Sequence, residues 1–215
     1  MRLVVFDVDG TLVDSQAAIL QAMAEAFAAA DLPPPDRAAA LAVVGLSLPV
    51  ALGRLAPQAS PAALSAMAGA YRAAYLRDRS VPPLYPGACD VLETLAAQDA
   101  TLLGIATGKS RRGLAALLQG HGLTDRFVTR QTGDDHPSKP HPAMLQAALD
   151  EAGVQPRDAV MIGDTGFDMA MARAARVPAI GVTWGYHPAA RLAGAAAIVD
   201  SFAQLLPALD RLGRP

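Results

Sequence analysis

The sequence contains a single cysteine and no long apolar run. Cys89 cannot form an internal disulfide, and we expect it to be a small buried side chain on a helix, without a chemical role. Although 52% of the 215 residues are hydrophobic, no run approaches the roughly 18 apolar residues of a membrane-spanning helix. The apolar stretch Leu3–Phe6 is too short for a secretory signal. We therefore expect a soluble, cytoplasmic protein with no membrane partner.

The chain also lacks a strong charge of either sign. The formal net charge is −2, and the arginines are scattered without aromatic residues between them. This pattern argues against a basic surface for nucleic acid, so no nucleic-acid partner is expected. Lysine is rare: Lys109 and Lys139 are the only two, and the other basic residues are arginine. A general bias toward arginine and alanine is enough to explain this rarity.

Five short apolar runs alternate with helix-like segments along the chain. Each run ends in polar residues or glycine, and this alternation is typical of a parallel sheet with helices on both faces. The sequence therefore predicts an α/β fold with a Rossmann-like parallel sheet. The runs are Leu3–Phe6, Leu102–Ala106, Phe127–Thr129, Ala159–Ile162 and Ala179–Val182.

A long insertion separates the first run from the second, where an ordinary crossover needs only about a dozen residues. Residues 15–83 are helical in pattern and are interrupted by prolines. We predict an all-α cap domain over 15–83, inserted into an α/β core domain of residues 1–14 and 84–215. Tyr71 and Tyr75 lie on an apolar helical stripe, so we expect them to be core residues rather than ligands. The cap is expected to move as a lid about its two chain crossings.

Two pairs of acidic residues follow strand-like runs. Asp7 and Asp9 come directly after the first run, and Asp164 and Asp168 come after the fourth. These positions lie at the carboxyl edge of an open parallel sheet, where ligands bind. Like charges this close require a cation or a shared proton, and Mg²⁺ prefers such oxygen ligands. Asp164 also fits a helix N-cap and Asp168 a solvated helix residue, but two clusters together favour a metal site.

Two further segments suit an anion. Residues 107–110, Thr-Gly-Lys-Ser, follow the second run and open a helix, so Thr107 and nearby backbone N–H groups can hold an anion. The same segment also fits a plain N-cap turn. Lys139 lies between prolines just before another helix and can be aimed toward a site, although alone it fits a surface lysine. His136 and His141 are expected to be ordinary loop histidines.

These segments, in this order, resemble the haloacid dehalogenase superfamily of phosphohydrolases, and more narrowly its capped, phosphoglycolate-phosphatase-like branch. The resemblance implies strand order 5-4-1-2-3 with a helical cap over the carboxyl edge of the sheet. It also implies a Mg²⁺-dependent phosphatase acting on a small phosphorylated metabolite, with phosphoglycolate the leading substrate. The resemblance rests on Asp7 to Ser15, Thr107, Lys139-Pro140 and Gly163 to Asp168, and it spans almost the whole chain.

The resemblance further implies catalytic roles for four residues of the first three segments. Asp7 is the nucleophile that forms an aspartyl phosphate, and Asp9 is the general acid and then the general base. Thr107 and Lys139 are catalytic groups that bind the phosphoryl oxygens. Gly108 is also expected to bind substrate, although relatives commonly have Asn there.

The implied metal ligands come from both acidic pairs. Mg²⁺ is expected to be bound by the Asp7 carboxylate, the Asp9 backbone carbonyl and the Asp164 carboxylate. Asp168 holds a metal-bound water or orients Lys139.

Two alternative functions fit the same motifs. A β-phosphoglucomutase-like phosphotransferase shares this catalytic core, although the cap turn at 44–49 offers little positive charge for a second phosphate. A non-catalytic regulatory protein is less expected, because all the catalytic groups are present. A dehalogenase is disfavoured because Asp9 supplies a proton that halide does not need. The oligomeric state, monomer or homodimer, is left open.

Overall fold

The computed structural model describes residues 1–77 and 81–213. Within these ranges, six parallel strands form one sheet in the order β3-β2-β1-β4-β5-β6. The strand order 5-4-1-2-3 implied by the resemblance is confirmed, and β6 extends the sheet beyond β5. The strands are β1 (Arg2–Phe6), β2 (Thr101–Ala106), β3 (Thr129–Gln131), β4 (Ala159–Gly163), β5 (Ala179–Val182) and β6 (Ala197–Val199).

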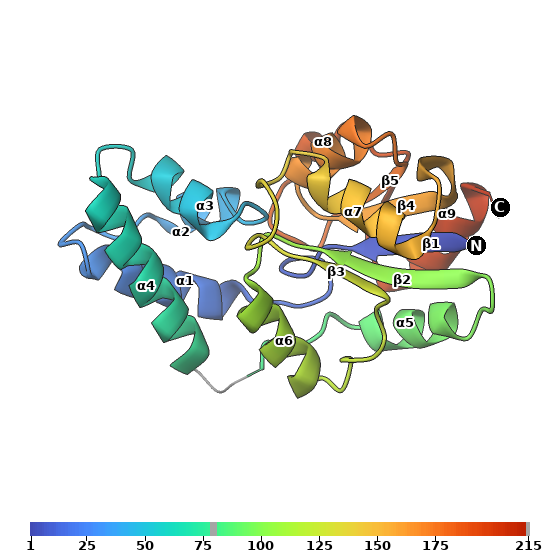
Figure 1. Cartoon of the computed structure of the whole chain (residues 1–215), viewed down its shortest axis with the longest axis horizontal. Helices are drawn as coiled ribbons and strands as arrows, with labels where there is room; N and C mark the ends of the chain where they lie inside the picture. Colours follow the sequence, from blue (N-terminus) through green and yellow to red (C-terminus); the bar gives the residue numbers. More distant parts are fainter. Residues whose placement is uncertain (78–80, 214–215) are drawn as a thin grey trace.

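Helices cover both faces of this sheet (Figure 1). Successive side chains of β1 point to opposite faces of the sheet. Val4 and Phe6 belong to the apolar core that α5, α6 and α9 share with one face. Leu3 and Val5 belong to the core that α7 and α8 share with the other face. Full burial of one such side chain stabilises the fold by about 1.5–3 kcal/mol. The helices are α5 (Ala88–Ala96), α6 (Arg111–Gly120), α7 (Ala143–Ala152), α8 (Gly166–Ala174) and α9 (Leu205–Arg211), with 3-10 turns at Pro156–Asp158, Ala189–Leu192 and Phe202–Gln204.

The structure corrects two strand predictions. The third strand is Thr129–Gln131 rather than Phe127–Thr129: Phe127 is buried in the core before the strand begins, and Val128 is 57% exposed. Pairing with β2 begins at Thr129, opposite Gly104. The sequence pattern missed β6, because this short strand lies in an alanine-rich segment without clear apolar alternation.

Cys89 lies on a helix as predicted, but the prediction that it is buried is wrong, because the thiol is exposed. Helix α5 buries the face that carries Ala88, Val91 and Leu92, and Cys89 lies on the other side of that helix, where its sulfur is 3.7 Å from Glu93 Oε1. A lone thiol in a helical pattern therefore did not indicate which face it occupies.

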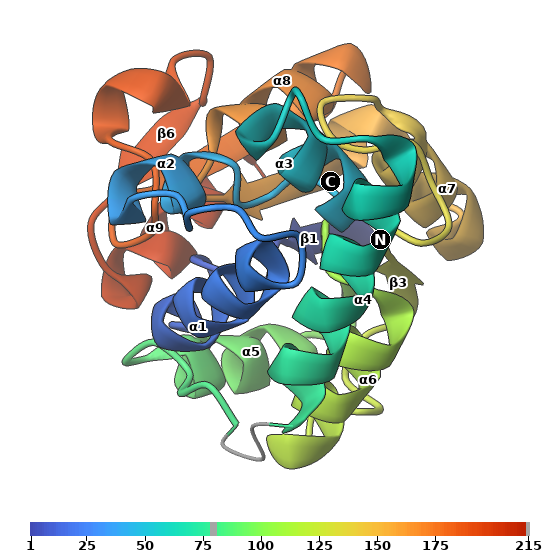
Figure 2. The same ribbon diagram turned by 90° about the vertical axis from the view of Figure 1, so that its left-hand side faces the viewer.

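Helices α1 to α4 form a separate layer beyond the carboxyl edge of the sheet, which confirms the predicted helical cap (Figures 1 and 2). They enclose a small core of their own around Met23, Phe27, Leu52 and Met67. Residues 78–80 of the predicted cap and 214–215 of the predicted core lie outside the described residues, and the domain boundaries stay a prediction. The helices are α1 (Gln16–Ala28), α2 (Arg37–Ala42), α3 (Leu48–Leu55) and α4 (Pro61–Arg77).

The two chain crossings between cap and core lie side by side. The Asp14 N–H donates to the Pro83 carbonyl over 2.9 Å, and the Tyr85 N–H donates to the Leu12 carbonyl over 2.9 Å. Two adjacent connections of this kind are a natural hinge. Movement of the cap as a lid stays a prediction.

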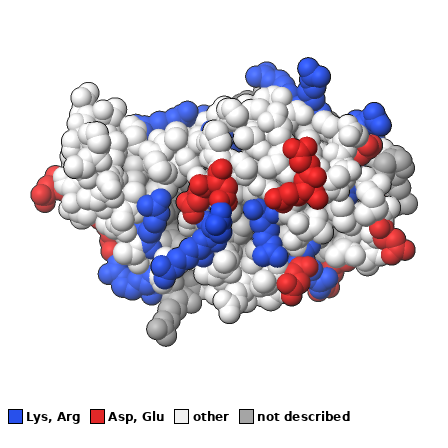
Figure 3. All heavy atoms as spheres, viewed as in Figure 1, with Lys and Arg blue, Asp and Glu red and all other residues white. Residues whose placement is uncertain are grey.

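The surface has no dominant charge on the face shown in Figure 3, where basic and acidic side chains are interspersed among uncharged ones. This fits the low net charge of the chain and gives no support to a nucleic-acid partner. None of the helices in the described ranges is long and apolar enough to cross a membrane.

Candidate active site

The strand register brings the acidic motifs together at one edge of the sheet. Phe6, the last residue of β1, is paired with Ile105 of β2 and Ile162 of β4. The residues that follow these parallel strands therefore emerge side by side, on the edge that the cap covers. Asp7 follows β1, and Asp164 follows β4.

Asp7 is buried beside a cation. Its Oδ1 accepts a 2.7 Å hydrogen bond from the Val8 N–H, and its Oδ2 lies 2.9 Å from Lys139 Nζ. This Oδ2 forms an ion pair with the lysine but accepts no well-aligned hydrogen bond from any described residue. Burial raises the pKa of Asp7 to about 7, although Lys139 opposes the shift. A buried oxygen with spare coordinating capacity therefore lies at the bottom of the site.

Asp164 is fully buried on the other side of this centre. The Thr11 hydroxyl donates to its Oδ1 over 2.9 Å, and the Tyr186 N–H donates to its Oδ2 over 2.8 Å. Burial, followed by the nearby carboxylates of Asp168 and Asp7, raises its pKa well above the ordinary value. Asp164 is not a helix N-cap, because α8 begins at Gly166 and is capped by the residue between them.

Asp168 is also fully buried, which rules out the solvated-helix alternative. Its Oδ1 accepts a 2.6 Å hydrogen bond from Lys139 Nζ, and its Oδ2 accepts from the Thr165 N–H and hydroxyl in a capping box. Burial alone would lower the pKa of Lys139, but Asp168 and Asp7 raise it above its usual range. Asp168 therefore fixes a charged lysine beside Asp7.

The carboxylates of Asp7, Asp164 and Asp168 fit a divalent cation. Each offers an oxygen, and these oxygens lie within 4.8 Å of one another. Among the described residues, Lys139 is the cation that pairs with Asp7 and Asp168, and no ion pair is found for Asp164, so three ionised carboxylates would exceed the positive charge beside them. Hard oxygen donors with one under-bonded oxygen suit Mg²⁺. The Asp9 side chain lies outside this group, and its backbone carbonyl as a ligand stays a prediction.

Asp9 faces a cavity between cap and core. Its Oδ1 accepts a 2.6 Å hydrogen bond from the Ser15 hydroxyl and lies 2.9 Å from Lys109 Nζ. Ser15 occupies the N-cap position of α1, but its side chain bonds Asp9 instead of the helix. Sequence reasoning gave Lys109 no role, because nothing local shows that its side chain turns back toward Asp9.

Thr107 and Gly108 lie on the loop after β2 and line the same cavity as Asp7 and Asp9. Thr107 is buried, and its hydroxyl oxygen accepts from the Lys109 N–H over 3.2 Å. A Cβ on Gly108 would lie 2.4 Å from the Leu46 carbonyl oxygen of the cap. The absence of a side chain therefore lets the cap turn approach this loop.

The cavity has a volume of about 220 Å³ and is walled mainly by apolar cap residues. Tyr71 and Tyr75 line it and also pack against the apolar clusters of the cap, so their prediction as core residues is confirmed only in part. The Tyr75 hydroxyl accepts a 2.8 Å hydrogen bond from Lys109 Nζ. The apolar stripe on α4 does face inward, as predicted, but it contacts the cavity as well as the cap core. The apolar lining includes Ile19, Met23, Val43, Val44, Leu46 and Leu48.

A segment that the sequence analysis missed supports the metal side of the site. Residues 183–187 follow β5 at the same sheet edge, and the Trp184 indole N–H donates to the Thr11 carbonyl over 3.0 Å. A Cβ on Gly185 would lie 2.2 Å from Cβ of Asp164, so only glycine fits there. The signal available was a lone tryptophan beside glycine directly after the fifth apolar run.

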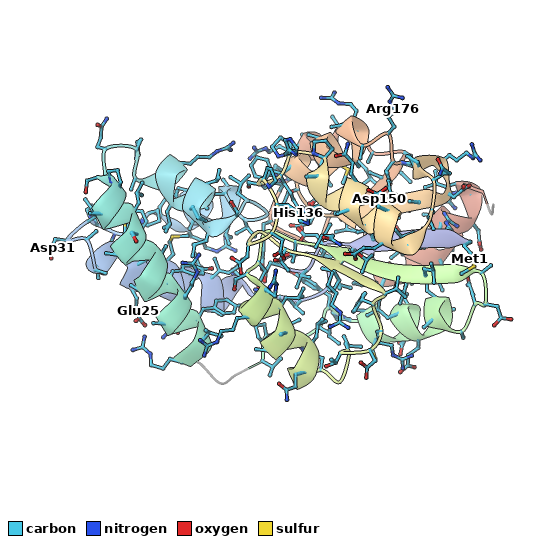
Figure 4. The ribbon with its side chains drawn as sticks, in the orientation of Figure 1. Met1, Glu25, Asp31, His136, Asp150 and Arg176 are labelled. Atoms are coloured by element: carbon cyan, nitrogen blue, oxygen red, sulfur yellow. The ribbon has the colours of Figure 1, made fainter. Side chains whose placement is uncertain are left out.

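The histidines near the site do not join the acidic group. Figure 4 labels His136 near the junction of cap and sheet, where its Nε2 lies 2.6 Å from Gln131 Oε1. His141 Nδ1 accepts from the Ala143 N–H over 3.2 Å. The potential metal ligands found among residues 1–77 and 81–213 include no histidine.

Comparisons with known proteins agree with this geometry. Residues 4–182 match the haloacid dehalogenase-like hydrolase family. The chain is 39% identical to a phosphoglycolate phosphatase of Rhodospirillum rubrum, covering 99% of this chain and 95% of the relative. It is 36% identical to the probable phosphatase IndB of Dickeya dadantii, covering 98% and 94%. The crystal structure of a hydrolase from Pseudomonas syringae superimposes with a TM-score of 0.88 at 27% identity, covering 98% and 99%.

These matches confirm the predicted family, the fold class and an enzyme that hydrolyses phosphoric monoesters. The match begins in β1 and ends in β5, so it includes all the acidic residues of the site as well as the cap. The chain belongs to the haloacid dehalogenase-like hydrolase family.

Proposed function

We propose that this protein is a Mg²⁺-dependent phosphatase that hydrolyses a small phosphomonoester through an aspartyl phosphate, with phosphoglycolate the leading substrate. The observation that carries the proposal is the buried carboxylate of Asp7, which lines the cavity and is flanked by Lys139, Asp164 and Asp168. The relatives named phosphoglycolate phosphatase support the choice of substrate. A cytoplasmic location stays a prediction.

In the first half-reaction, the Asp7 carboxylate attacks phosphorus and the bond from phosphorus to the ester oxygen breaks. Asp9 gives a proton to the departing oxygen, so the product leaves as an alcohol. Thr107 and Lys139 bind the phosphoryl oxygens and stabilise the charge that develops on them. Bound Mg²⁺ supplies positive charge that allows the anionic nucleophile to approach the anionic phosphate.

In the second half-reaction, water attacks the phosphorus of the aspartyl phosphate. Asp9, now ionised, takes a proton from that water, and inorganic phosphate leaves as the Asp7 carboxylate is restored. Asp9 faces the cavity while Asp7 is buried at its base, an arrangement that suits one proton carrier and one nucleophile.

We further propose that residues 15–83 act as a cap domain that closes over this reaction. The apolar lining from α1 and α3 and from the turn between α2 and α3 would exclude bulk water from the aspartyl phosphate until the alcohol has left. The paired crossings beside Asp14 and Tyr85 would let the cap open and close as a unit.

A phosphate-release screen tests the proposed function. The purified protein is incubated with Mg²⁺ and a panel containing 2-phosphoglycolate, ethyl phosphate, sugar phosphates and an aryl phosphate. We expect Mg²⁺-dependent release of phosphate, with the highest kcat/KM for small esters. Absence of release from every ester would contradict the proposal.

Asp9→Asn is expected to lower kcat by about 10²- to 10⁴-fold, because the amide cannot transfer a proton. The nucleophile stays in place, so the variant should bind substrate and accumulate slow labelling of Asp7. Rapid-quench labelling with radioactive substrate phosphate measures this. Asp14→Asn is the control, since Asp14 is an exposed neighbouring carboxylate outside the cavity. Near-normal turnover in Asp9→Asn would show that Asp9 is not the proton carrier.

Gly108→Ala is expected to lower kcat/KM by about 10- to 100-fold, because a displacement of about 1 Å near the reacting groups has effects of this size. The new Cβ would meet the Leu46 and Gly45 carbonyl oxygens and hold the cap away from the loop. Gly53→Ala is the control, since a Cβ there meets nothing within 4 Å. Steady-state kinetics equal to those of the parent would mean that this close approach has no role in turnover.

A further inference from the structure

The ester oxygen of a bound substrate and Lys109 must lie close together. On the proposed function, the ester oxygen meets Asp9, because it receives a proton there. Lys109 Nζ lies 2.9 Å from Asp9 Oδ1. Thr107 and Lys109 lie two residues apart on the loop after β2. On the proposed function, Thr107 binds the phosphoryl group, and Lys109 is a cation beside the leaving group.

The Lys109 ammonium has the properties of a receptor for a second anion. Its side chain is only 6% exposed and it lines the cavity. Among the described residues, its hydrogen-bonding partners are Asp9 and the Tyr75 hydroxyl, which use two of its three N–H donors, and the ammonium also lies 4.3 Å from the centre of the Tyr75 ring. Its ion pair with the Asp9 carboxylate favours the charged ammonium.

The size of the cavity and its apolar walls favour a short leaving group, although Arg72, Ser110 and Asp134 also line it. A volume of about 220 Å³ is small for a ligand site, since sites for drug-sized ligands have about 300–1,000 Å³. The walls contributed by Ile19, Val43, Val44 and Leu46 offer no side-chain hydrogen-bonding groups. The hydroxyls of a sugar would be left unpaired against these walls, whereas a carboxylate one carbon from the ester oxygen can reach Lys109.

We propose that Lys109, held by Tyr75 of the cap, is the specificity-determining residue that binds the carboxylate of a short phosphorylated hydroxy acid. The proposal rests on the proposed phosphatase function and names the groups of this chain that select its substrate. Since Tyr75 belongs to α4 and Lys109 to the loop after β2, the selecting pair forms only when the cap and the core are together.

The test compares two esters that differ mainly in this charge, 2-phosphoglycolate and ethyl phosphate. The readout is the ratio of their kcat/KM values, because Lys109 also contacts Asp9 and its loss can slow both reactions. Lys109→Met is expected to lower this ratio by about 10- to 100-fold, the strength of a charged hydrogen bond. Lys109→Arg should retain most of the preference.

Variants at other positions separate this role from alternatives. Tyr75→Phe keeps the ring but removes the hydroxyl that holds Lys109, so it should lower the ratio severalfold even if Lys109→Met fails to fold. Arg72→Met and Arg112→Met are controls, since both arginines line the cavity but are exposed, and the ratio should stay unchanged. Loss of the preference in Arg72→Met would overturn the assignment in favour of the cap arginine.

Measurements on the parent protein distinguish failure of the inference about Lys109 from failure of the proposed phosphatase function. If it hydrolyses both esters with equal kcat/KM, the inference about Lys109 fails while the proposed phosphatase function stands. If it releases phosphate from neither these esters nor an aryl phosphate, the proposed function itself fails. A ratio that is unchanged in Lys109→Met and in Tyr75→Phe would also overturn the assignment.

Discussion

Replacement of Asp7 by Asn is expected to abolish turnover and to abolish labelling of the protein by radioactive substrate phosphate. The change removes the attacking oxygen and, at the same time, a charge that the proposed cation requires. Asp9 is held by Ser15 and Lys109, and Asp168 by Lys139, so neither carboxylate is expected to take over the attack. Loss of both signals separates a nucleophile from a residue that only binds substrate.

The folded state should tolerate this change. Burial raises the pKa of Asp7 to about 7, so the protein already disfavours the ionised form when no cation is present. A neutral amide avoids this penalty, and Lys139 keeps its ion pair with Asp168. We therefore expect the Tm of metal-free Asp7→Asn at neutral pH to equal or exceed that of the parent, as measured by differential scanning calorimetry.

Asp134→Asn is the matched control for this experiment. Asp134 lines the same cavity but is exposed, and its Oδ2 accepts from the Arg111 N–H over 2.9 Å. Its amide variant should keep turnover and labelling. Normal labelling of Asp7→Asn would place the covalent intermediate on another residue and would remove the basis of the proposed mechanism.

The features that the sequence predicted well are those that depend on local pattern. Apolar runs such as Ala159–Ile162 identified the central strands, because strands buried on both faces are continuously apolar. The carboxyl ends of parallel strands meet at one edge, so the positions of Asp7 and Asp164 in the sequence implied that they lie close together. The weaker edge strands were harder: β6 has few distinctive residues, and Phe127 marked the core rather than the strand.

Contacts between cap and core could not be predicted in the same way. The pairing of Lys109 with Tyr75 joins α4 to a loop of the core, and its formation depends on how two separately packed units meet. The contact between Tyr186 and Ser15 is of the same kind. Local periodicity shows that a helix face is buried, but not whether it meets another helix or a cavity. Lys109 and Tyr75, whose roles the sequence did not show, lie at this junction.

Removal of divalent cations by a chelator is also expected to abolish turnover, and addition of Mg²⁺ should restore it. Buried Asp7, Asp164 and Asp168 offer oxygens within 4.8 Å of one another, and their combined charge repels an incoming phosphate unless a cation offsets it. Mn²⁺ or Co²⁺ is expected to substitute, whereas Ca²⁺ should support turnover poorly because its longer and more variable coordination displaces the nucleophile. Full turnover in metal-free buffer would contradict the proposed site.

Stability provides a second measurement that does not depend on activity. The folded-state pKa of Asp7 is about 7, above its ordinary value of 3.8, so the folded protein binds the extra proton between these values. This contribution to stability is therefore present at low pH and is lost as the pH rises through about 7. Because a cation binds the ionised carboxylates, the gain in Tm on adding Mg²⁺ should be larger at about pH 8 than at about pH 5.

The stabilisation by Mg²⁺ should have a predictable size and should depend on Asp164. Mg²⁺ at about 100 times its Kd should raise the free energy of unfolding by about 2.7 kcal/mol. Asp164→Asn should reduce the gain sharply, since it removes a carboxylate that Thr11 and Tyr186 hold toward the centre. Asp134→Asn should leave the gain unchanged. An equal gain in parent and Asp164→Asn would mean that the cation binds elsewhere, since a cation at the predicted centre cannot be indifferent to the loss of this charge.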